Sequence, residues 1–192
     1  MRGISGHARL AGVIGWPVGH SRSPRLHNYW LEKHGIDGAY VPLAVKPEDL
    51  EGVLKALPRM GFRGVNLTLP HKEAALRLVD RADPMAQRIG AVNTIVFTDQ
   101  GKAIGSSTDG LGFLENLREA EPGFSAKAGP AVILGAGGAA ASIAFALEED
   151  GCPDIRIANR TFEKSQALAE RLGPCARPVP WEERAQALEG AA

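Results

Sequence analysis

The sequence predicts an α/β protein built from two domains. Short apolar runs alternate with helix-like stretches along the 192 residues, a pattern typical of a mostly parallel sheet covered by helices. A turn-rich stretch at 121–130 interrupts this alternation, as expected near a domain boundary. A glycine-rich turn follows the first strand-like run after it. We expect an N-terminal three-layer αβα domain at 1–107, a connecting helix and linker at 108–127, and an incomplete second α/β domain at 128–192.

Hydrophobic periodicity assigns the individual elements. The helix expected at 47–57, for example, has apolar residues from Leu50 to Leu57 at i, i+3, i+4 and i+7, which predicts one buried face. In the first domain we expect strands at 10–15, 39–45, 64–69 and 93–98, the last pairing with 103–105, and helices at 24–34, 47–57 and 71–79. Further on we expect strands at 131–134, 155–158 and 177–179, and helices at 111–119, 139–147, 163–172 and 182–188.

Composition excludes several classes of protein. The formal net charge is zero and 44% of the residues are hydrophobic, which favours a folded protein whose main partner is neither nucleic acid nor a membrane. The apolar stretch at 10–16 is short and broken by glycine, so it is a poor signal peptide and too short for a transmembrane helix. We therefore expect a cytoplasmic protein with a small-molecule partner, and we expect a monomer or a homodimer.

Neither the cysteines nor the histidines indicate a metal site. Cys152 and Cys175 form no Cys-x-x-Cys motif and have no histidine nearby, which argues against zinc and against a disulfide framework. His20, His27 and His34 are spaced seven residues apart, about two helical turns, which is too far to share one ion. We expect no metal.

The glycine-rich turn has the pattern of a dinucleotide site. Gly135-Ala136-Gly137-Gly138-Ala139-Ala140 follows a predicted strand, opens a predicted helix and matches G-x-G-x-x-G/A. The first glycine permits a tight turn, the second lets a pyrophosphate approach the backbone, and the small last residue lets helix and strand pack closely. N–H groups at the helix start would then face the phosphate. We expect a Rossmann domain whose cofactor contacts include Gly135, Ala136, Gly137, Gly138 and Ala139; the alternative is a glycine-rich turn in an ordinary α/β fold.

The end of the second strand in this domain indicates which cofactor binds. An acidic residue there usually holds the ribose 2′-hydroxyl of NAD, but this chain has Asn159, Arg160 and Thr161, with Lys164 one turn later. The planar guanidinium of Arg160 suits a 2′-phosphate. We therefore expect these four residues to bind NADP. In the alternative, Thr161 only caps a helix and Arg160 is a solvated loop residue.

In the first domain, polar residues gather near the predicted ends of strands. Ser23 precedes Pro24, so it is suited to cap a helix that has proline at its first position. That explanation leaves Ser21 unexplained, and two hydroxyls beside a helix start would also suit a carboxylate. Asn66 and Thr68 alternate with apolar neighbours, so both point to one side of a strand.

Three more polar residues are candidates for chemistry. Lys72 falls in the first turn of a predicted helix, where the helix dipole disfavours a cation; a solvated surface lysine is the alternative. Asn93 follows Ala91-Val92, and Asp109 lies near another helix start. The Asp109 carboxylate is either a simple cap or the partner that a buried lysine would need.

Taken together, these segments resemble the shikimate dehydrogenase family over essentially the whole chain. The motifs that carry the resemblance are H-S-x-S-P at 20–24, N-x-T-x-P-x-K at 66–72, A-V-N-T at 91–94, T-D-G at 108–110, GAGGAA at 135–140 and N-R-T at 159–161. The resemblance implies an oxidoreductase of the chorismate and aromatic amino-acid pathway, which reduces 3-dehydroshikimate with NADPH to shikimate and NADP.

The resemblance also implies a role for each site residue. Ser21 and Ser23 would bind the substrate carboxylate, while Asn66, Thr68, Asn93 and Asp109 would hold its ring hydroxyls. Lys72 and Asp109 would form the catalytic pair, with Lys72 handling the proton on the reacting oxygen and also contacting the substrate.

Two departures from the family pattern stand out. Ser107 occupies the position before T-D-G where the family usually has asparagine, and only 58 residues remain from Gly135 onward, enough for three strands of a sheet that normally has about six. We expect a C-terminally incomplete chain that by itself is weakly active or inactive. The alternatives are a quinate/shikimate dehydrogenase with broader substrate or NAD use, and a non-catalytic binding protein for shikimate-like ligands.

Overall fold

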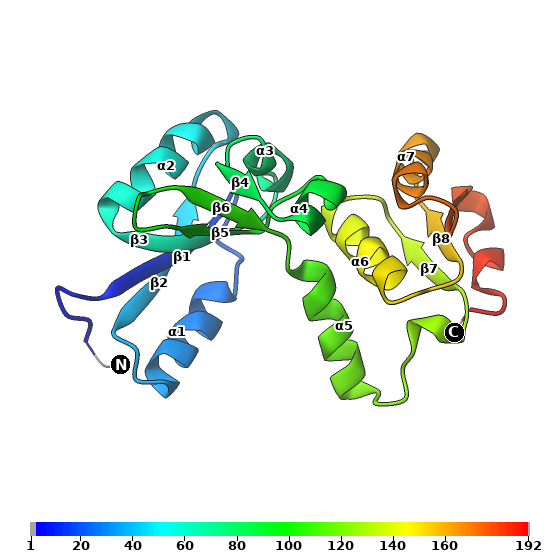
Figure 1. Cartoon of the computed structure of the whole chain (residues 1–192), viewed down its shortest axis with the longest axis horizontal. Helices are drawn as coiled ribbons and strands as arrows, with labels where there is room; N and C mark the ends of the chain where they lie inside the picture. Colours follow the sequence, from blue (N-terminus) through cyan, green and yellow to red (C-terminus); the bar gives the residue numbers. More distant parts are fainter. Residues whose placement is uncertain (1–2, 192) are drawn as a thin grey trace. The chain divides into compact units, whose positions relative to one another are not determined.

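Contacts divide the chain into two compact units, and the computed structural model describes residues 3–191 of them. The first unit ends at Ser107 and the second begins at Thr108. Figure 1 follows both units along the chain. The segment 108–127, which we expected to connect the domains, belongs to the second unit, because its helix packs on a helix of that unit. Among residues 3–191, no helix has both the length and the apolar character that a membrane span requires.

The first unit is built on a six-stranded sheet with the order β2-β1-β3-β5-β6-β4. The strands are β1 (Arg9–Gly15), β2 (Gly38–Ala44), β3 (Phe62–Leu67), β4 (Arg81–Ala82), β5 (Thr94–Phe97) and β6 (Ala103–Ser106). Only β5 runs antiparallel to its neighbours β3 and β6, whereas β1 with β2, β1 with β3, and β4 with β6 pair in parallel. The expected mostly parallel sheet, and the pairing of 93–98 with 103–105, are confirmed.

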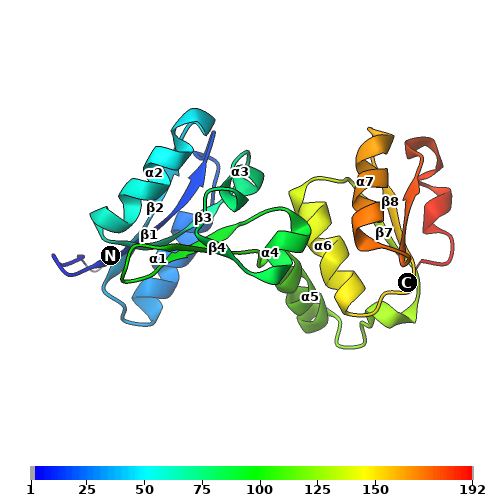
Figure 2. The same ribbon diagram turned by 45° about the horizontal axis from the view of Figure 1, so that its top comes forward.

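Helices cover both faces of this sheet, so the three-layer αβα prediction is confirmed. The helices are α1 (Ser23–Lys33), α2 (Leu50–Ala56), α3 (Lys72–Leu76) and α4 (Pro84–Ile89). Figures 1 and 2 show α1 and α2 on opposite faces. The predicted helix 47–57 is less regular than expected, because α2 is flanked by 3-10 turns at Pro47–Asp49 and Leu57–Met60.

The prediction of a helix at 71–79 was too long, and α4 was missed. Helix α3 ends at Leu76 because Asp80 pairs with Ala103, its N–H donating to the Ala103 carbonyl at 2.9 Å and its carboxylate accepting from the Ala103 N–H at 2.8 Å. Helix α4 has capping signals that an analysis of hydrophobic periodicity does not detect. The side chain of Asp83 caps its start, and Gly90 ends it with φ +75°.

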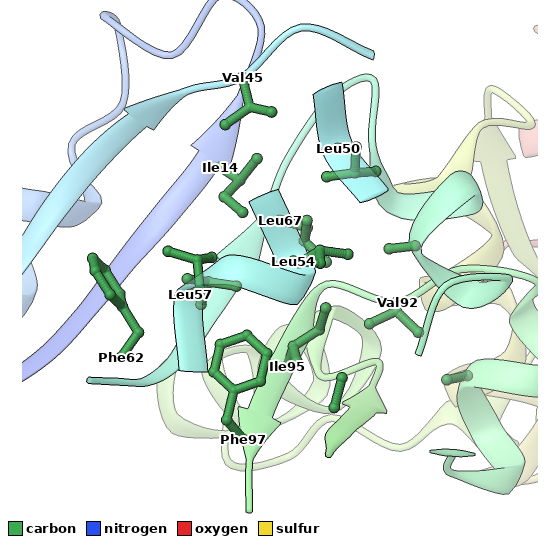
Figure 3. Packing of buried hydrophobic residues seen from close by; sticks show 14 residues of the cluster. Ile14, Val45, Leu50, Leu54, Leu57, Phe62, Leu67, Val92, Ile95 and Phe97 are labelled. Atoms are coloured by element: carbon green, nitrogen blue, oxygen red, sulfur yellow. The ribbon is translucent and has the colours of Figure 1, made fainter. Parts of the chain in front are cut away.

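Most of the core of this unit lies between α2 and the sheet, and Figure 3 shows this packing at close range. The predicted apolar face of α2 is confirmed, since Leu50, Leu54 and Leu57 are buried there with Ile14 of β1. Each such side chain contributes about 1.5–3 kcal/mol to folding. Because side chains alternate along a strand, Val13 points to the other face, where α1 packs.

The second unit begins with α5 (Asp109–Ala120), which packs on α6 (Gly138–Glu149). Three parallel strands follow the order β7-β8-β9, with β7 at Ala131–Leu134, β8 at Ile155–Ala158 and β9 at Ala176–Val179. Helix α7 spans Phe162–Leu172 between β8 and β9. This alternation agrees with the predicted Rossmann domain.

The helix predicted at 182–188 was wrong. Two 3-10 turns, Trp181–Glu183 and Gln186–Leu188, occupy the segment. A tertiary contact holds the end of this segment: the Arg156 guanidinium on β8 donates to the carbonyls of Ala187 and Glu189 at 2.7 Å each, and Ala187 is buried. The segment therefore follows the contacts of β8 and not the helical periodicity of its sequence.

Candidate substrate and nucleotide sites

The candidate substrate residues of the first unit belong to segments near a switch point of its sheet. After β1 the chain crosses through α1 to β2 on one side, and then through α2 to β3 on the other side. In open α/β sheets, ligands bind outside the carboxyl ends of strands at such a point. The loops after β1 and β3 meet there, since the Trp16 N–H donates to the Leu69 carbonyl at 3.1 Å and the Thr68 N–H to the Ile14 carbonyl at 2.9 Å.

The structural roles of the two serines in the first loop differ from those that we expected. Helix α1 has Arg22 at its N-cap and begins with Ser23, so the prediction that Ser23 caps it was wrong. The hydroxyl oxygen of Ser21 accepts from the Ser23 N–H at 3.3 Å, as serines do in local turns. Within residues 3–191 the Ser23 hydroxyl has no hydrogen bond, and both serines are half-buried. The Ser23 hydroxyl and the Ser21 O–H donor are therefore suited to an anion.

The two asparagines lie side by side where β3, β5 and β6 meet. Asn66 near the end of β3 is paired in register with Thr94, the first residue of β5. The buried Asn93 precedes Thr94, and its backbone accepts from the Leu67 N–H at 2.8 Å and donates to the Ser106 carbonyl at 3.0 Å. The Asn66 Nδ2 donates to the Thr94 hydroxyl at 3.0 Å. Thr68, half-buried, follows β3 directly.

Lys72 begins α3, in the first turn of a helix as predicted, and its backbone is fixed from two sides. The Lys72 carbonyl accepts from the Val92 N–H at 2.9 Å. The preceding residue, His71, is only 1% exposed, and its Nε2–H donates to the Val45 carbonyl at 2.9 Å. Lys72 is half-buried, and its catalytic role remains a prediction.

Asp109 belongs to the second unit, whereas Lys72 belongs to the first. Asp109 is the first residue of α5, follows Thr108 at the N-cap, and is half-buried. A carboxylate in the first turn of a helix interacts favourably with the helix dipole. The pairing of Asp109 with Lys72 remains a prediction.

The glycine-rich turn is tight at Gly135 and open at the start of α6. Gly135 has φ +122°, a left-handed value that favours glycine, and its N–H donates to the Ala158 carbonyl at 2.8 Å. A Cβ added to Gly135 would lie 4.0 Å from the Ala140 Cβ, whereas Cβ atoms at Gly137 or Gly138 would meet nothing within 4 Å. The turn therefore packs closely at its first and last positions and is open between them, where α6 starts.

The segment after β8 presents two cations. Arg160 and Lys164 are exposed, and neither forms an ion pair with any residue from 3 to 191. Thr161 occupies the N-cap of α7, as the alternative predicts, although its side chain makes no capping hydrogen bond. The binding of a 2′-phosphate by this segment remains a prediction. Asn159 is half-buried, and its Nδ2 donates to the Thr161 carbonyl at 2.8 Å.

Three residues around the substrate side were missed by sequence reasoning. His71 supports Lys72, Thr94 contacts both asparagines, and the Tyr40 hydroxyl donates to the Asn66 Oδ1 at 2.7 Å. Thr94 could have been noticed as the last residue of the Ala-Val-Asn-Thr segment. Tyr40 gave no local signal, because its partner lies 26 residues away.

Together, the switch-point residues and the open glycine turn define an α/β protein of the nucleotide-dependent dehydrogenase class. Residues 13–95 match the family described as "Shikimate dehydrogenase substrate binding domain", and residues 118–191 match "Shikimate / quinate 5-dehydrogenase". The chain belongs to the shikimate dehydrogenase family.

Curated relatives bear the same family name. Shikimate dehydrogenase (NADP(+)) of Paramagnetospirillum magneticum is 59% identical over 189 residues, which span 98% of this chain and 68% of the relative. The protein of the same name from Rhodospirillum rubrum is 57% identical over 194 residues, with the same coverage of 98% and 68%. The chain thus spans about two thirds of the length of these relatives.

Solved structures also resemble the chain. Shikimate 5-dehydrogenase from Thermus thermophilus, in complex with NADP(H) and shikimate, has a TM-score of 0.83 and 47% identity, covering 91% of this chain and 64% of that one. Quinate dehydrogenase from Corynebacterium glutamicum in complex with NAD has a TM-score of 0.84 and 31% identity, covering 95% and 66%.

Proposed function

We propose that the protein is an NADP-dependent shikimate dehydrogenase, which converts 3-dehydroshikimate, NADPH and a proton reversibly into shikimate and NADP. The observation that carries this proposal is that backbone hydrogen bonds join the segments that bear the hydroxyl, amide and ammonium groups beside the switch point of the sheet, in a chain of this family. The 59% identity to a relative named shikimate dehydrogenase (NADP(+)) supports both the reaction and the cofactor. A cytoplasmic location remains a prediction.

Each polar residue has a task in this proposal. The hydroxyls of Ser21 and Ser23 bind the substrate carboxylate, a task that the uncommitted hydroxyl of Ser23 supports. The side chains of Asn66, Thr68, Asn93 and Asp109 hold the ring hydroxyls. The main-chain N–H groups from Gly135 to Ala139 bind the pyrophosphate at the start of α6, while Asn159, Arg160, Thr161 and Lys164 bind the 2′-phosphate side of the cofactor.

Lys72 and Asp109 carry the proton chemistry. When bound, NADPH supplies the hydride that the ring carbon accepts. The Lys72 ammonium donates a proton to the ketone oxygen as negative charge develops on it, and in the reverse direction Lys72 accepts that proton. Asp109 hydrogen-bonds to the same region and orients it. The anchored backbone of Lys72 supports this role, because a proton donor must be held at a defined position.

The direct test is an assay of the protein expressed from its complete reading frame. We expect NADPH oxidation in the presence of 3-dehydroshikimate and NADP reduction in the presence of shikimate, followed by the absorbance of the nicotinamide. A folded protein that catalyses neither direction would rule out the proposed function.

Replacing Arg160 tests how the cofactor is chosen. Arg160→Ala should raise the Kd of NADP about 10–100-fold, the equivalent of losing hydrogen bonds between charged groups, and should leave the Kd of NAD nearly unchanged. Arg160→Lys is the matched control: it keeps the charge but loses the planar fork, so an intermediate Kd is expected. Calorimetric titration gives both constants. Equal losses for the two cofactors would mean that Arg160 does not bind the 2′-phosphate.

The second candidate is a quinate/shikimate dehydrogenase. The family description that matches residues 118–191 includes quinate, and the quinate dehydrogenase from Corynebacterium glutamicum is 31% identical. The exposed Arg160 and Lys164 favour NADP over NAD. Values of kcat/KM for shikimate and quinate with each cofactor, measured side by side, distinguish the two enzymes.

A further inference from the structure

Four polar side chains of the first unit form one hydrogen-bonded chain across β2, β3 and the start of β5. The Tyr40 hydroxyl donates to the Asn66 Oδ1 at 2.7 Å. The Asn66 Nδ2 donates to the Thr94 hydroxyl at 3.0 Å, and the Thr94 hydroxyl donates to the Asn93 Oδ1 at 2.9 Å. Each of the two hydroxyl groups donates its proton to one acceptor in this chain. Removing a hydroxyl therefore leaves the neighbouring amide without one hydrogen bond.

A backbone carbonyl beside Asn66 favours one direction for this chain. The Asn66 Nδ2 also donates to the Asn93 carbonyl at 3.4 Å. A carbonyl can only accept hydrogen bonds, so turning the Asn66 amide over would bring its oxygen against the Asn93 carbonyl oxygen. At the other end, burial raises the pKa of Tyr40 to about 12. The Tyr40 hydroxyl therefore keeps its proton at neutral pH and remains a donor to Asn66.

Tyr40 itself is held rigidly. It is only 5% exposed, and its ring stacks on His27 with ring centroids 4.1 Å apart. The Asn28 side chain clamps its backbone, donating to the Tyr40 carbonyl at 2.8 Å and accepting from the Tyr40 N–H at 3.0 Å. A hydroxyl held in this way can fix the orientation of its partner amide.

The fixed amide restricts what Asn66 can bind. Both hydrogens of its Nδ2 are donated within the protein, and Tyr40 occupies one lone pair of its Oδ1. Asn66 is half-buried, and the second lone pair of its Oδ1 is left to accept a hydrogen bond from a ligand. Asn66 is therefore set to accept a hydrogen bond and not to donate one.

We propose that Tyr40 is a positioning residue for substrate selection, acting through Asn66. This inference rests on the proposed function, in which Asn66 binds a ring hydroxyl. A hydroxyl can donate to the Asn66 oxygen and a ketone oxygen cannot. Asn66 therefore recognises a hydroxyl that persists in both substrate and product, and not the oxygen that is oxidised. Thr94 orients the amide of Asn93 in the same way.

The test compares two tyrosine-to-phenylalanine variants of the protein expressed from its complete reading frame. Tyr40→Phe removes the hydroxyl at the start of the chain, and Tyr29→Phe removes the hydroxyl of the other tyrosine, which is 58% exposed on α1. We expect Tyr40→Phe to raise the KM for shikimate about three- to tenfold, the effect of losing one hydrogen bond. The kcat and the KM for NADP should change by less than about twofold, and Tyr29→Phe should match the wild type.

A double-mutant cycle separates positioning from a general structural effect. If Tyr40 acts through Asn66, Tyr40→Phe should not raise the KM further in an Asn66→Ala background. Thr94→Val should raise the KM for shikimate, and Thr94→Ser, which keeps the hydroxyl, should restore it.

The two hypotheses fail differently. A wild-type protein that does not turn over shikimate contradicts the proposed function. An active wild type in which Tyr40→Phe behaves like Tyr29→Phe, or in which its effect persists without Asn66, overturns the positioning role. So would a Thr94→Ser variant that is as impaired as Thr94→Val.

Discussion

Replacing Lys72 with alanine should lower kcat by about 10²–10⁴-fold, the range expected when a positioned proton donor is lost. The KM for shikimate should change far less, because the serines and asparagines that we propose to bind the substrate remain. A large fall in kcat with little change in KM identifies an interaction made mainly in the transition state. Steady-state kinetics in both directions, on the protein expressed from its complete reading frame, measure the effect.

The control for this experiment is a lysine on the same unit with no proposed task. Lys55 on α2 is exposed and forms an i,i+4 ion pair with Glu51 at 2.6 Å, a surface contact that contributes little to stability. Lys55→Ala should leave kcat unchanged. If Lys72→Ala also keeps its kcat, Lys72 has no part in the proton transfer. Thermal unfolding of both variants separates a catalytic loss from a folding defect.

Replacing Gly110 with alanine should destabilise the second unit by about 1–3 kcal/mol or more, as overpacking does. Gly110 lies in the first turn of α5, directly after Asp109, where α5 packs on α6. A Cβ at this position would press on the Ser142 carbonyl oxygen and lie 2.9 Å from the Ala146 Cβ. The backbone of α6 cannot yield without moving the helix, so the glycine of the T-D-G motif has a packing role.

Gly112 provides the matched control two residues further along α5. A Cβ there would meet nothing within 4 Å, so Gly112→Ala should stabilise the helix by about 0.5–1 kcal/mol through helix propensity alone. Both variants gain the same propensity, and the difference between them isolates the packing of α5 on α6. Denaturant unfolding measures that difference. Equal free energies of unfolding would contradict the close contact at Gly110.

Local patterns in the sequence determined much of the fold. Strands β7 and β8 match their predicted bounds, because short apolar runs between turns leave little choice of structure. The turn at Gly135 was also predictable, since only a small set of residues permits such a conformation. The motif spacing indicated the family, and the comparisons confirm it.

Long-range contacts decided what local patterns could not. The stop of α3 depends on the pairing of Asp80 with Ala103, and Arg156 of β8 binds the Ala187 carbonyl, 31 positions further along the chain. The hydrogen bond from Tyr40 to Asn66 joins residues 26 positions apart. Sequence alone therefore determined the class of fold, the family and the identity of the candidate site residues, because these depend on local periodicity and on motif spacing. Tertiary structure decided which partner orients each side chain, because hydrogen bonds between distant segments form only once the strands have paired.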